Sequence, residues 1–196
     1  MSSENLSPDR LEAFSDGVIA VIITIMVLEL KSPHGEGLAA LRTVTPSLLV
    51  YALSFMAVAI MWVNHHHVLG KALRADPALL WANNCLLFWM SLIPFVTAYM
   101  GENHAAPLAA ACYGAVFALT SAAFLLLQIT IDRQDKANAA RRREFLWMKR
   151  KAVFSMVSYA ASVGLAFVSV HVALGIFVLF PALYFWPEGK AHAARR

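Results

Sequence analysis

The sequence predicts an all-α integral membrane protein, because apolar residues dominate its composition and gather in long runs. Of its 196 residues, 60% are hydrophobic and only 14% are charged, and mean hydropathy is +0.62. A soluble domain usually has about half apolar and about a quarter charged residues. One span of a bilayer core needs about 20 mostly apolar helical residues, and several stretches of the chain reach that length. We therefore expect most of the chain to lie in lipid.

Six transmembrane helices in a single domain, residues 1–196, are expected from these runs. Four spans come from separate apolar runs, and the last two come from one tract between Ala152 and Trp186. That tract is too long for one span and short for two. We interpret it as a tight hairpin that turns near His171; one long tilted helix, leaving five spans, is the alternative. The expected spans are about 11–30, 46–67, 78–100, 107–131, 150–168 and 172–186.

Basic residues between the spans favour one side of the membrane. The segment 132–151 holds eight bases and three acids, whereas the connector "GENH" after the third span holds no Lys or Arg. The positive-inside rule assigns the basic side to the cytoplasm, so six spans place both termini there in a multi-pass protein of the cell membrane. The N-terminal stretch "MSSENLSPDR" lacks the apolar segment of a signal peptide. The basic runs fit a solvated loop near anionic headgroups, and no nucleic-acid partner is expected.

Polar residues at one end of the first three spans are expected to share one depth. Unpaired polar groups at membrane depth cost several kcal/mol, so a hydrogen-bonded clamp joining the three helices is the economical interpretation. A metal site at the three consecutive histidines is disfavoured, because neighbours on a helix point about 100° apart; a pH-sensing role stays open. The expected set is Arg10, Ser15, Asp16, Asn64, His65, His66, His67, Asn83 and Asn84.

The first helix has a second, apolar face. Stepping about 100° per residue from Arg10 places Phe14, Gly17, Val21, Thr24 and Leu28 on one narrow stripe. Ser15 and Asp16 point to either side of the opposite face. Periodicity alone leaves open whether the stripe faces lipid, a core or a pore.

The stretch from Arg10 to Asp16, "RLEAFSD", resembles the R-x-x-x-F-S-D signature of the transmembrane protein 175 family of potassium channels. The following "GVIAVIITIMVLEL" with Pro33, the histidines after Trp62, and the third-span pattern of Asn83, Asn84, Pro94 and Phe95 are also similar to that family. The order of spans resembles the prokaryotic form, which has one six-helix repeat per subunit.

The resemblance implies a homotetramer in the lipid bilayer, with a central pore lined by the first helix of each subunit. It implies a first hydrophobic constriction at Val21, where an isoleucine is usual, and further pore-facing positions at Thr24, Ile25 and Leu28. Potassium is the implied permeant ion, and no cofactor or metal is implied. A ring of apolar side chains can dewet when narrow and conduct when widened.

These residues bear on four classes of function. A potassium-preferring channel is expected, and a proton-permeable or weakly selective cation channel is the alternative. A secondary transporter is less favoured, because Pro94 has no matching helix break in the other half of the chain. An enzyme is not expected, because no serine has an evident base partner and the polar groups cluster at one end.

Overall fold

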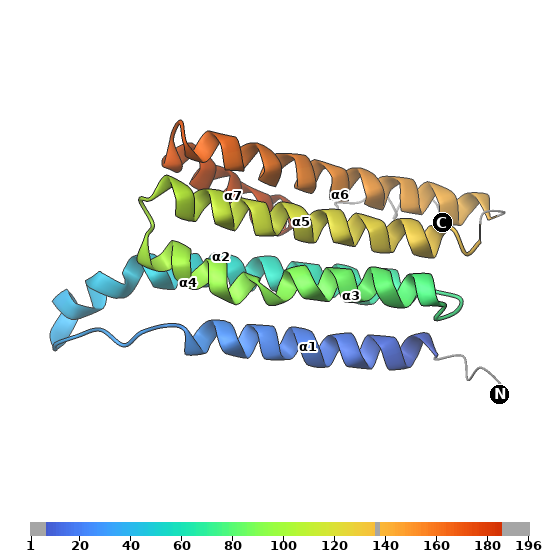
Figure 1. Ribbon diagram of the computed structural model, residues 1–196, viewed down its shortest axis with the longest axis horizontal. Coiled ribbons are helices and arrows are strands. Elements are labelled where there is room, and N and C mark those ends of the chain that lie inside the picture. The colour runs from blue at the N-terminus through green and yellow to red at the C-terminus, as the bar shows by residue number, and fades with distance from the viewer. Residues whose placement is uncertain (1–6, 136–137, 186–196) are drawn as a thin grey trace, which may run out of the picture.

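The computed structural model describes residues 7–135 and 138–185, and its described residues form helices joined by short connections. Figure 1 shows the helices lying side by side along one axis, with α1 at one edge of the bundle, α5 in the middle and α6 with α7 at the other edge. The helices are α1 (Pro8–Leu28), α2 (Gly37–Leu69), α3 (Pro77–Ser91), α4 (Ile93–Glu102), α5 (Pro107–Asp132), α6 (Ala139–Ala166) and α7 (Val170–Phe185).

Prolines mark the beginnings and the breaks of these helices. Pro8, Pro77 and Pro107 each lie in the first turn of a helix, where a missing N–H costs nothing. Pro94 instead interrupts the third apolar run and separates α3 from α4 at Leu92. Pro46 lies inside α2, whose first turns slant away from the bundle (Figure 1). An interior proline removes a backbone hydrogen bond and favours such a bend.

The prediction of six transmembrane helices per subunit is wrong. Within the described residues, four helical stretches are long and apolar enough to cross a membrane: α1, α2, the α3–α4 pair and α5. The tract after Ala152 does turn, at residues 167–169. Among the residues whose side chains the structure describes, as far as Leu179, its arms fall short of a span, because the first half of α6 is strongly charged and the qualifying apolar part of α7 is Val170–Leu179. A span of the hydrocarbon core needs about 20 apolar residues.

The core of the molecule surrounds α5, which packs against α6, α3, α4, α7 and α2. Gly114 leaves room for α6 beside α5, because a Cβ at this position would lie only 2.4 Å from Ser162 Oγ. Beside Gly114, the ring centroid of Tyr113 lies 4.6 Å from that of Phe117 and 4.7 Å from that of Phe177. Aromatic pairs at such distances add about 0.5–1.5 kcal/mol beyond their buried area. These contacts hold the α6–α7 hairpin against α5.

Candidate functional site: the two faces of α1

The first helix presents one covered and one uncovered face. Leu11, Ser15, Ile19, Ile22 and Met26 are buried at helical spacing, and they face α2, α3 and α4, the helices that α1 contacts. On the uncovered face, Val21 is 55% exposed, Ile25 41% and Leu28 79%. Phe14, Gly17 and Thr24 are exposed as well. We call Phe14, Gly17, Val21, Thr24, Ile25 and Leu28 the open stripe.

Within the open stripe, Thr24 presents an oxygen rather than a proton. Its hydroxyl donates to the carbonyl oxygen of Val21, with 2.8 Å between the two oxygens. The lone pairs of that hydroxyl therefore stay available as acceptors on an otherwise apolar surface. One level of the stripe can thus receive a cation or a water molecule, while the neighbouring levels cannot.

A chain of buried hydrogen bonds fastens the covered face of α1 to two other helices. His65 Nε2 donates to Asn83 Oδ1 at 2.8 Å, because an amide oxygen can only accept. Asn83 Nδ2 donates to Ser15 Oγ at 2.9 Å, and Ser15 Oγ donates to the carbonyl of Leu11 at 2.8 Å. His65, Asn83 and Ser15 are fully buried. Each loss of such a bond would strand a buried polar group, so this chain fixes the rotation of α1 against α2 and α3.

Two further contacts tie the same end of α1 to α2. Trp62 Nε1 donates to Asp16 Oδ1 at 2.9 Å, and the Glu12 carboxylate contacts His66 Nδ1. Trp62 and His66 lie one turn apart on α2, as Glu12 and Asp16 do on α1, so the two pairs form successive rungs. Sequence reasoning missed Glu12 and Trp62, although this shared spacing of four residues was readable.

The remaining residues of the expected clamp go elsewhere. His67 Nε2 lies 3.4 Å from Glu144 of α6, which also accepts from Lys71 Nζ at 2.8 Å. The hydrogen bond from Lys71 holds the pKa of the Glu144 carboxyl below its usual value, although burial opposes this. Arg10 and Asn84 are exposed, and Asn64 donates to the carbonyl of Ile60 in its own helix.

The three consecutive histidines therefore face three different partners: Asn83, Glu12 and Glu144. Among the residues that the structure describes, no group of three or more His, Cys, Asp or Glu side chains is placed to hold a metal ion.

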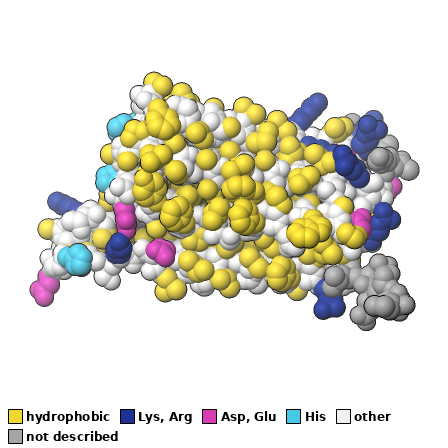
Figure 2. Space-filling view, viewed as in Figure 1, with side chains coloured by type: hydrophobic (Ala, Val, Ile, Leu, Met, Phe, Trp, Pro, Cys, Tyr) yellow, Lys and Arg dark blue, Asp and Glu magenta, His cyan; other side chains and the backbone are white. Residues whose placement is uncertain are grey.

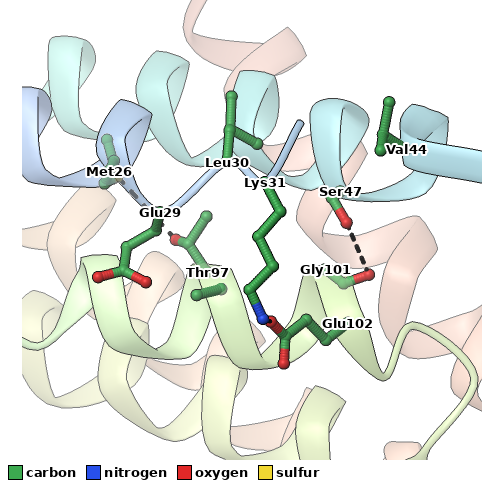
Figure 3. Close-up of a pocket in the computed structure, with 10 residues that line it drawn as sticks. Met26, Glu29, Leu30, Lys31, Val44, Ser47, Thr97, Gly101 and Glu102 are labelled. Carbon is green, nitrogen blue, oxygen red and sulfur yellow. Dashed lines mark hydrogen bonds and ion pairs between the residues drawn. The ribbon is translucent and has the colours of Figure 1, made fainter. Parts of the chain in front are cut away.

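At the opposite end, a small pocket lies between α1, α2 and α4 (Figure 3). Lys31 reaches across to Glu102 with 2.5 Å between Nζ and Oε1, and this contact raises the pKa of Lys31. Ser47 Oγ donates to the carbonyl of Gly101 at 3.0 Å. The pocket is lined by Met26, Glu29, Leu30, Lys31, Val44, Ser47, Thr97, Ala98, Gly101 and Glu102.

Next to this pocket, a second buried polar layer joins α4, α2 and α5. Thr97 Oγ1 donates to Ser54 Oγ at 2.8 Å, and the hydroxyls of Ser54 and Tyr113 lie 2.9 Å apart. Thr97 also contacts the sulfur of Met26 on α1 at 4.0 Å. The two polar layers hold α1 near its two ends and leave the open stripe free of partners among the described residues.

Residues 10–94 match the family model described as the endosomal/lysosomal potassium channel TMEM175. The chain is 38% identical to a protein of Chryseobacterium sp. (strain P1-3) named as a potassium channel, over 94% of this chain and 96% of the relative. It is 34% identical to a protein of Chamaesiphon minutus with the same kind of name, over 93% and 95% of the two chains. The human protein named endosomal/lysosomal proton channel TMEM175 is 31% identical over 46% of this chain and 20% of its own length.

Solved structures have the same fold. The structure titled as a lysosomal potassium-selective channel TMEM175 homolog from Chamaesiphon minutus superimposes with a TM-score of 0.79 and 32% identity, covering 90% of this chain and 95% of that chain. A variant of the potassium channel MtTMEM175, in complex with a nanobody fusion protein, superimposes with a TM-score of 0.66, covering 93% of this chain and 92% of that chain. At 16% identity, the second match bears on the fold alone.

Proposed function

Because this chain belongs to the TMEM175 family, we propose that it is a potassium channel whose conduit is formed by the open stripes of α1 in four copies of the chain. Full-length relatives named as potassium channels support the ion. The position of the conduit rests on one observation: the open stripe of α1 is exposed in the single chain. The number of copies rests on the resemblance to the family.

The chain is a multi-pass membrane protein without an enzymatic role, in keeping with its relatives and its apolar helices. We place it in the cell membrane with its N-terminus in the cytoplasm. The basic start of α6 follows four spans, an even number, and so lies on the same side as the N-terminus. The positive-inside rule makes that side cytoplasmic.

Selectivity in this proposal comes from dehydration in a neutral neck. Four valine side chains from Val21 form an apolar ring, which empties of water when narrow and blocks ions. A wider ring passes ions that shed part of their hydration shell. Potassium sheds water more readily than sodium, so the neck favours potassium. The Thr24 oxygens, one turn further on, replace part of the lost hydration because their protons are already donated to Val21 carbonyls.

The buried hydrogen bonds serve this function by setting which face of α1 points to the conduit. A rotation of about 100°, one residue's worth, would carry Val21 off the axis. The contacts of Ser15 with Asn83 and of Asp16 with Trp62 oppose that rotation. These residues therefore act on conduction through the orientation of α1 and not by touching the ion.

The test measures ion flux through purified protein in liposomes, for Val21→Ala and for a matched control, Val27→Ala. Val27 is also exposed on α1, at 46%, but points about 120° away from Val21 around the helix. We expect Val21→Ala to increase leak and to reduce the preference for potassium over sodium, with Val27→Ala unchanged. Wild-type reversal potentials and currents in Val21→Ala would contradict the placement.

Proton permeability is a second candidate, because vertebrate relatives named as proton channels match part of this chain. The same liposomes discriminate the two. A pH gradient imposed without a potassium gradient should collapse quickly if protons permeate. If the channel is potassium-preferring, the pH gradient should persist while labelled potassium equilibrates.

A further inference from the structure

A stripe of side chains on the outer face of α6 changes from basic to apolar along its length. Arg143, Trp147, Arg150, Phe154 and Val157 follow one another three or four residues apart, so they share one side of the helix. All five are exposed, with Trp147 at 47%, Phe154 at 58% and Val157 at 55%. We call these five residues the α6 stripe. Its order is two bases with a tryptophan between them, followed by apolar side chains.

The opposite side of α6 is anchored to the bundle. Phe145, Ala152, Tyr159 and Ser162 are buried, and the α5–α6 contact is tight at Gly114 and Ser162. Figure 1 shows α6 running alongside α5. The basic half of α6 is therefore held against the bundle by its own inner face.

Two contacts fix the depth of the α6 stripe relative to α5. Lys149 Nζ pairs with Asp132 Oδ2 at 2.5 Å, at the last residue of α5. Gly114, near the start of α5, meets Ser162. Arg150 thus lies at the level where α5 ends, and Val157 lies alongside the apolar middle of α5. A helix spanning a bilayer ends near the headgroups, so Trp147 lies at the depth where interfacial tryptophans are enriched.

The charges of the stripe are not neutralised within the part of the chain that the structure describes. Lys149 and Lys71 have acidic partners, and Lys151 Nζ lies 3.3 Å from the centre of the Trp147 ring. Arg143 and Arg150 are exposed and form no ion pair with any described residue. Figure 2 shows Lys and Arg gathered at this end of the molecule and hydrophobic side chains over the middle.

We propose that the α6 stripe binds an anionic phospholipid of the adjoining leaflet. The phosphate lies between the guanidinium groups of Arg143 and Arg150, the glycerol region lies at Trp147, and an acyl chain runs along Phe154 and Val157. The two arginines are two turns apart, about 10.5 Å along the axis, and their long side chains can converge on one phosphate above Trp147. Arginine suits this role because its planar fork pairs with two phosphate oxygens.

A lipid fits this stripe better than an acidic protein partner does. Charge complementarity would satisfy only its basic half, whereas the apolar half lies at the depth of α5, where acyl chains are the available neighbours. Each basic side chain near an anionic membrane surface favours binding by about 1 kcal/mol, which is about fivefold in the binding constant. Two arginines therefore predict a preference of up to about 25-fold over a zwitterionic lipid, and this preference should be sensitive to salt.

The experiment measures quenching of Trp147 fluorescence by brominated lipids in reconstituted protein. The signal of Trp147 is the difference between wild type and Trp147→Phe. Brominated phosphatidylglycerol is compared with brominated phosphatidylcholine at equal mole fractions in a phosphatidylcholine background. We expect phosphatidylglycerol to quench at a several-fold lower mole fraction, and we expect about 0.5 M salt to reduce this difference without any substitution.

The variant Arg143→Gln/Arg150→Gln should bring the two lipids to within about twofold of each other. The matched control is Arg42→Gln, because Arg42 is an exposed base of α2 at the opposite end of the bundle. Equal quenching by the two lipids in wild type, or a preference that survives the double variant or the high salt, would overturn the proposal. The measurement involves no ion flux, so its failure leaves the channel function untouched.

Discussion

The helices α1 and α5 are both apolar and long enough to span a bilayer, yet the chain covers them very differently. In the most apolar stretch of α5, 61% of the residues are buried, compared with 28% in α1. Five helices contact α5, whereas α1 contacts α2, α3 and α4 through one face. The chain therefore completes the surroundings of α5 by itself. The open stripe of α1 stays uncovered by its own chain, so water, lipid or another protein chain must cover it. A helix that contacts other subunits in an assembly is expected to have such a face.

The two helices are also held by different kinds of contact. Close packing dominates the contacts of α5, at Gly114 and the rings around Tyr113, although the Tyr113 hydroxyl also shares a buried hydrogen bond with Ser54. Directional hydrogen bonds hold α1, from Asn83 to Ser15 and from Trp62 to Asp16. Packing gives stability over a large area, whereas hydrogen bonds fix orientation at a few points. Substitutions in the packed face of α5 should thus lower the stability of the protein, and substitutions in the hydrogen bonds of α1 should change the orientation of α1.

The largest effect is expected from Gly114→Leu, which would disrupt the close packing of α5 against α6. A Cβ at this position already lies 2.4 Å from Ser162 Oγ and 3.2 Å from the carbonyl oxygen of Tyr159. Overpacking of this kind costs about 3 kcal/mol, or a drop of about 6–12 °C in Tm for a chain of this size. Thermal melts followed by size exclusion measure it. Gly164→Leu is the control, because nothing lies within 4 Å of a Cβ there; equal loss in both variants would argue against the tight α5–α6 contact.

Next in size is Asn83→Leu, which removes the hold on the covered face of α1. The substitution leaves His65 Nε2 without an acceptor and Ser15 Oγ without a donor in a fully buried layer. We expect a loss of about 2–3 kcal/mol, seen as a Tm lower by about 4–12 °C. Asn84→Leu is the matched control, because Asn84 is exposed and should tolerate the change. A neutral Asn83→Leu would show that the hydrogen-bond chain does not hold α1.

A third prediction sharpens the contrast between the two faces of α1 through the accessibility of introduced cysteines. In a background lacking Cys85 and Cys112, Thr24→Cys should react quickly with a charged thiol reagent and lose flux. Ile22→Cys should react at least about tenfold more slowly, because Ile22 is only 3% exposed and thiolate access limits the reaction. Reaction rates and flux block are measured in the same liposomes. Comparable rates at the two positions would mean that α1 is not held in the orientation described.

The smallest effect concerns Asp76, which caps the helix that contacts both α1 and α5. Its carboxylate accepts from Leu79 N at 2.9 Å, and this hydrogen bond lowers the pKa of Asp76 from its ordinary 3.8. Because the folded pKa lies below the unfolded one, the carboxylate contributes stability above about pH 4 and loses it as pH falls through the folded pKa.

Asp76→Ala should therefore cost about 1 kcal/mol at about pH 7, and the cost should shrink as pH falls below about 4 through the folded pKa, as measured by melts across that range. Asp9→Ala, which removes an exposed acid in the first turn of α1, is the control for the loss of a surface charge. A constant cost for Asp76→Ala at every pH would contradict capping by the ionised carboxylate.

The apolar runs predicted four helical stretches that are long and apolar enough to cross a membrane, because hydropathy depends on composition and not on partners. The boundaries were less predictable: α2 begins at Gly37, well before the expected residue 46, because Arg42 and Thr43 interrupt the apolar run and Pro46 suggests a helix start. The charged segment expected as a loop instead forms the first half of α6. Phe145 in this segment is buried, a contact that the charge pattern does not indicate. The count of six spans had a different source, which was the division of the tract between Ala152 and Trp186 into two spans.

Within the site, the sequence indicated which polar residues could lie near one another, but not which of them form hydrogen bonds. Ser15, Asn83 and His65 do meet, whereas the adjacent Asn84 faces outward. One step along a helix turns a side chain by about 100°, so the choice between neighbours depends on how α3 is rotated in the bundle. That rotation is set by tertiary packing, which a single sequence does not display. Whether the open stripe lines a conduit stays a prediction.

The break at Leu92 gives the bundle a mechanical property that an unbroken rod would lack. The segment before the break holds α1 at Ser15, and the segment after it contacts α1 at Met26. A continuous helix would transmit torque from one attachment to the other, whereas a proline interruption absorbs it. The two ends of α1 thus rest on supports that can adjust independently. In the proposed channel, the Leu28 end of α1 can therefore shift while the hydrogen bonds at Ser15 stay in place.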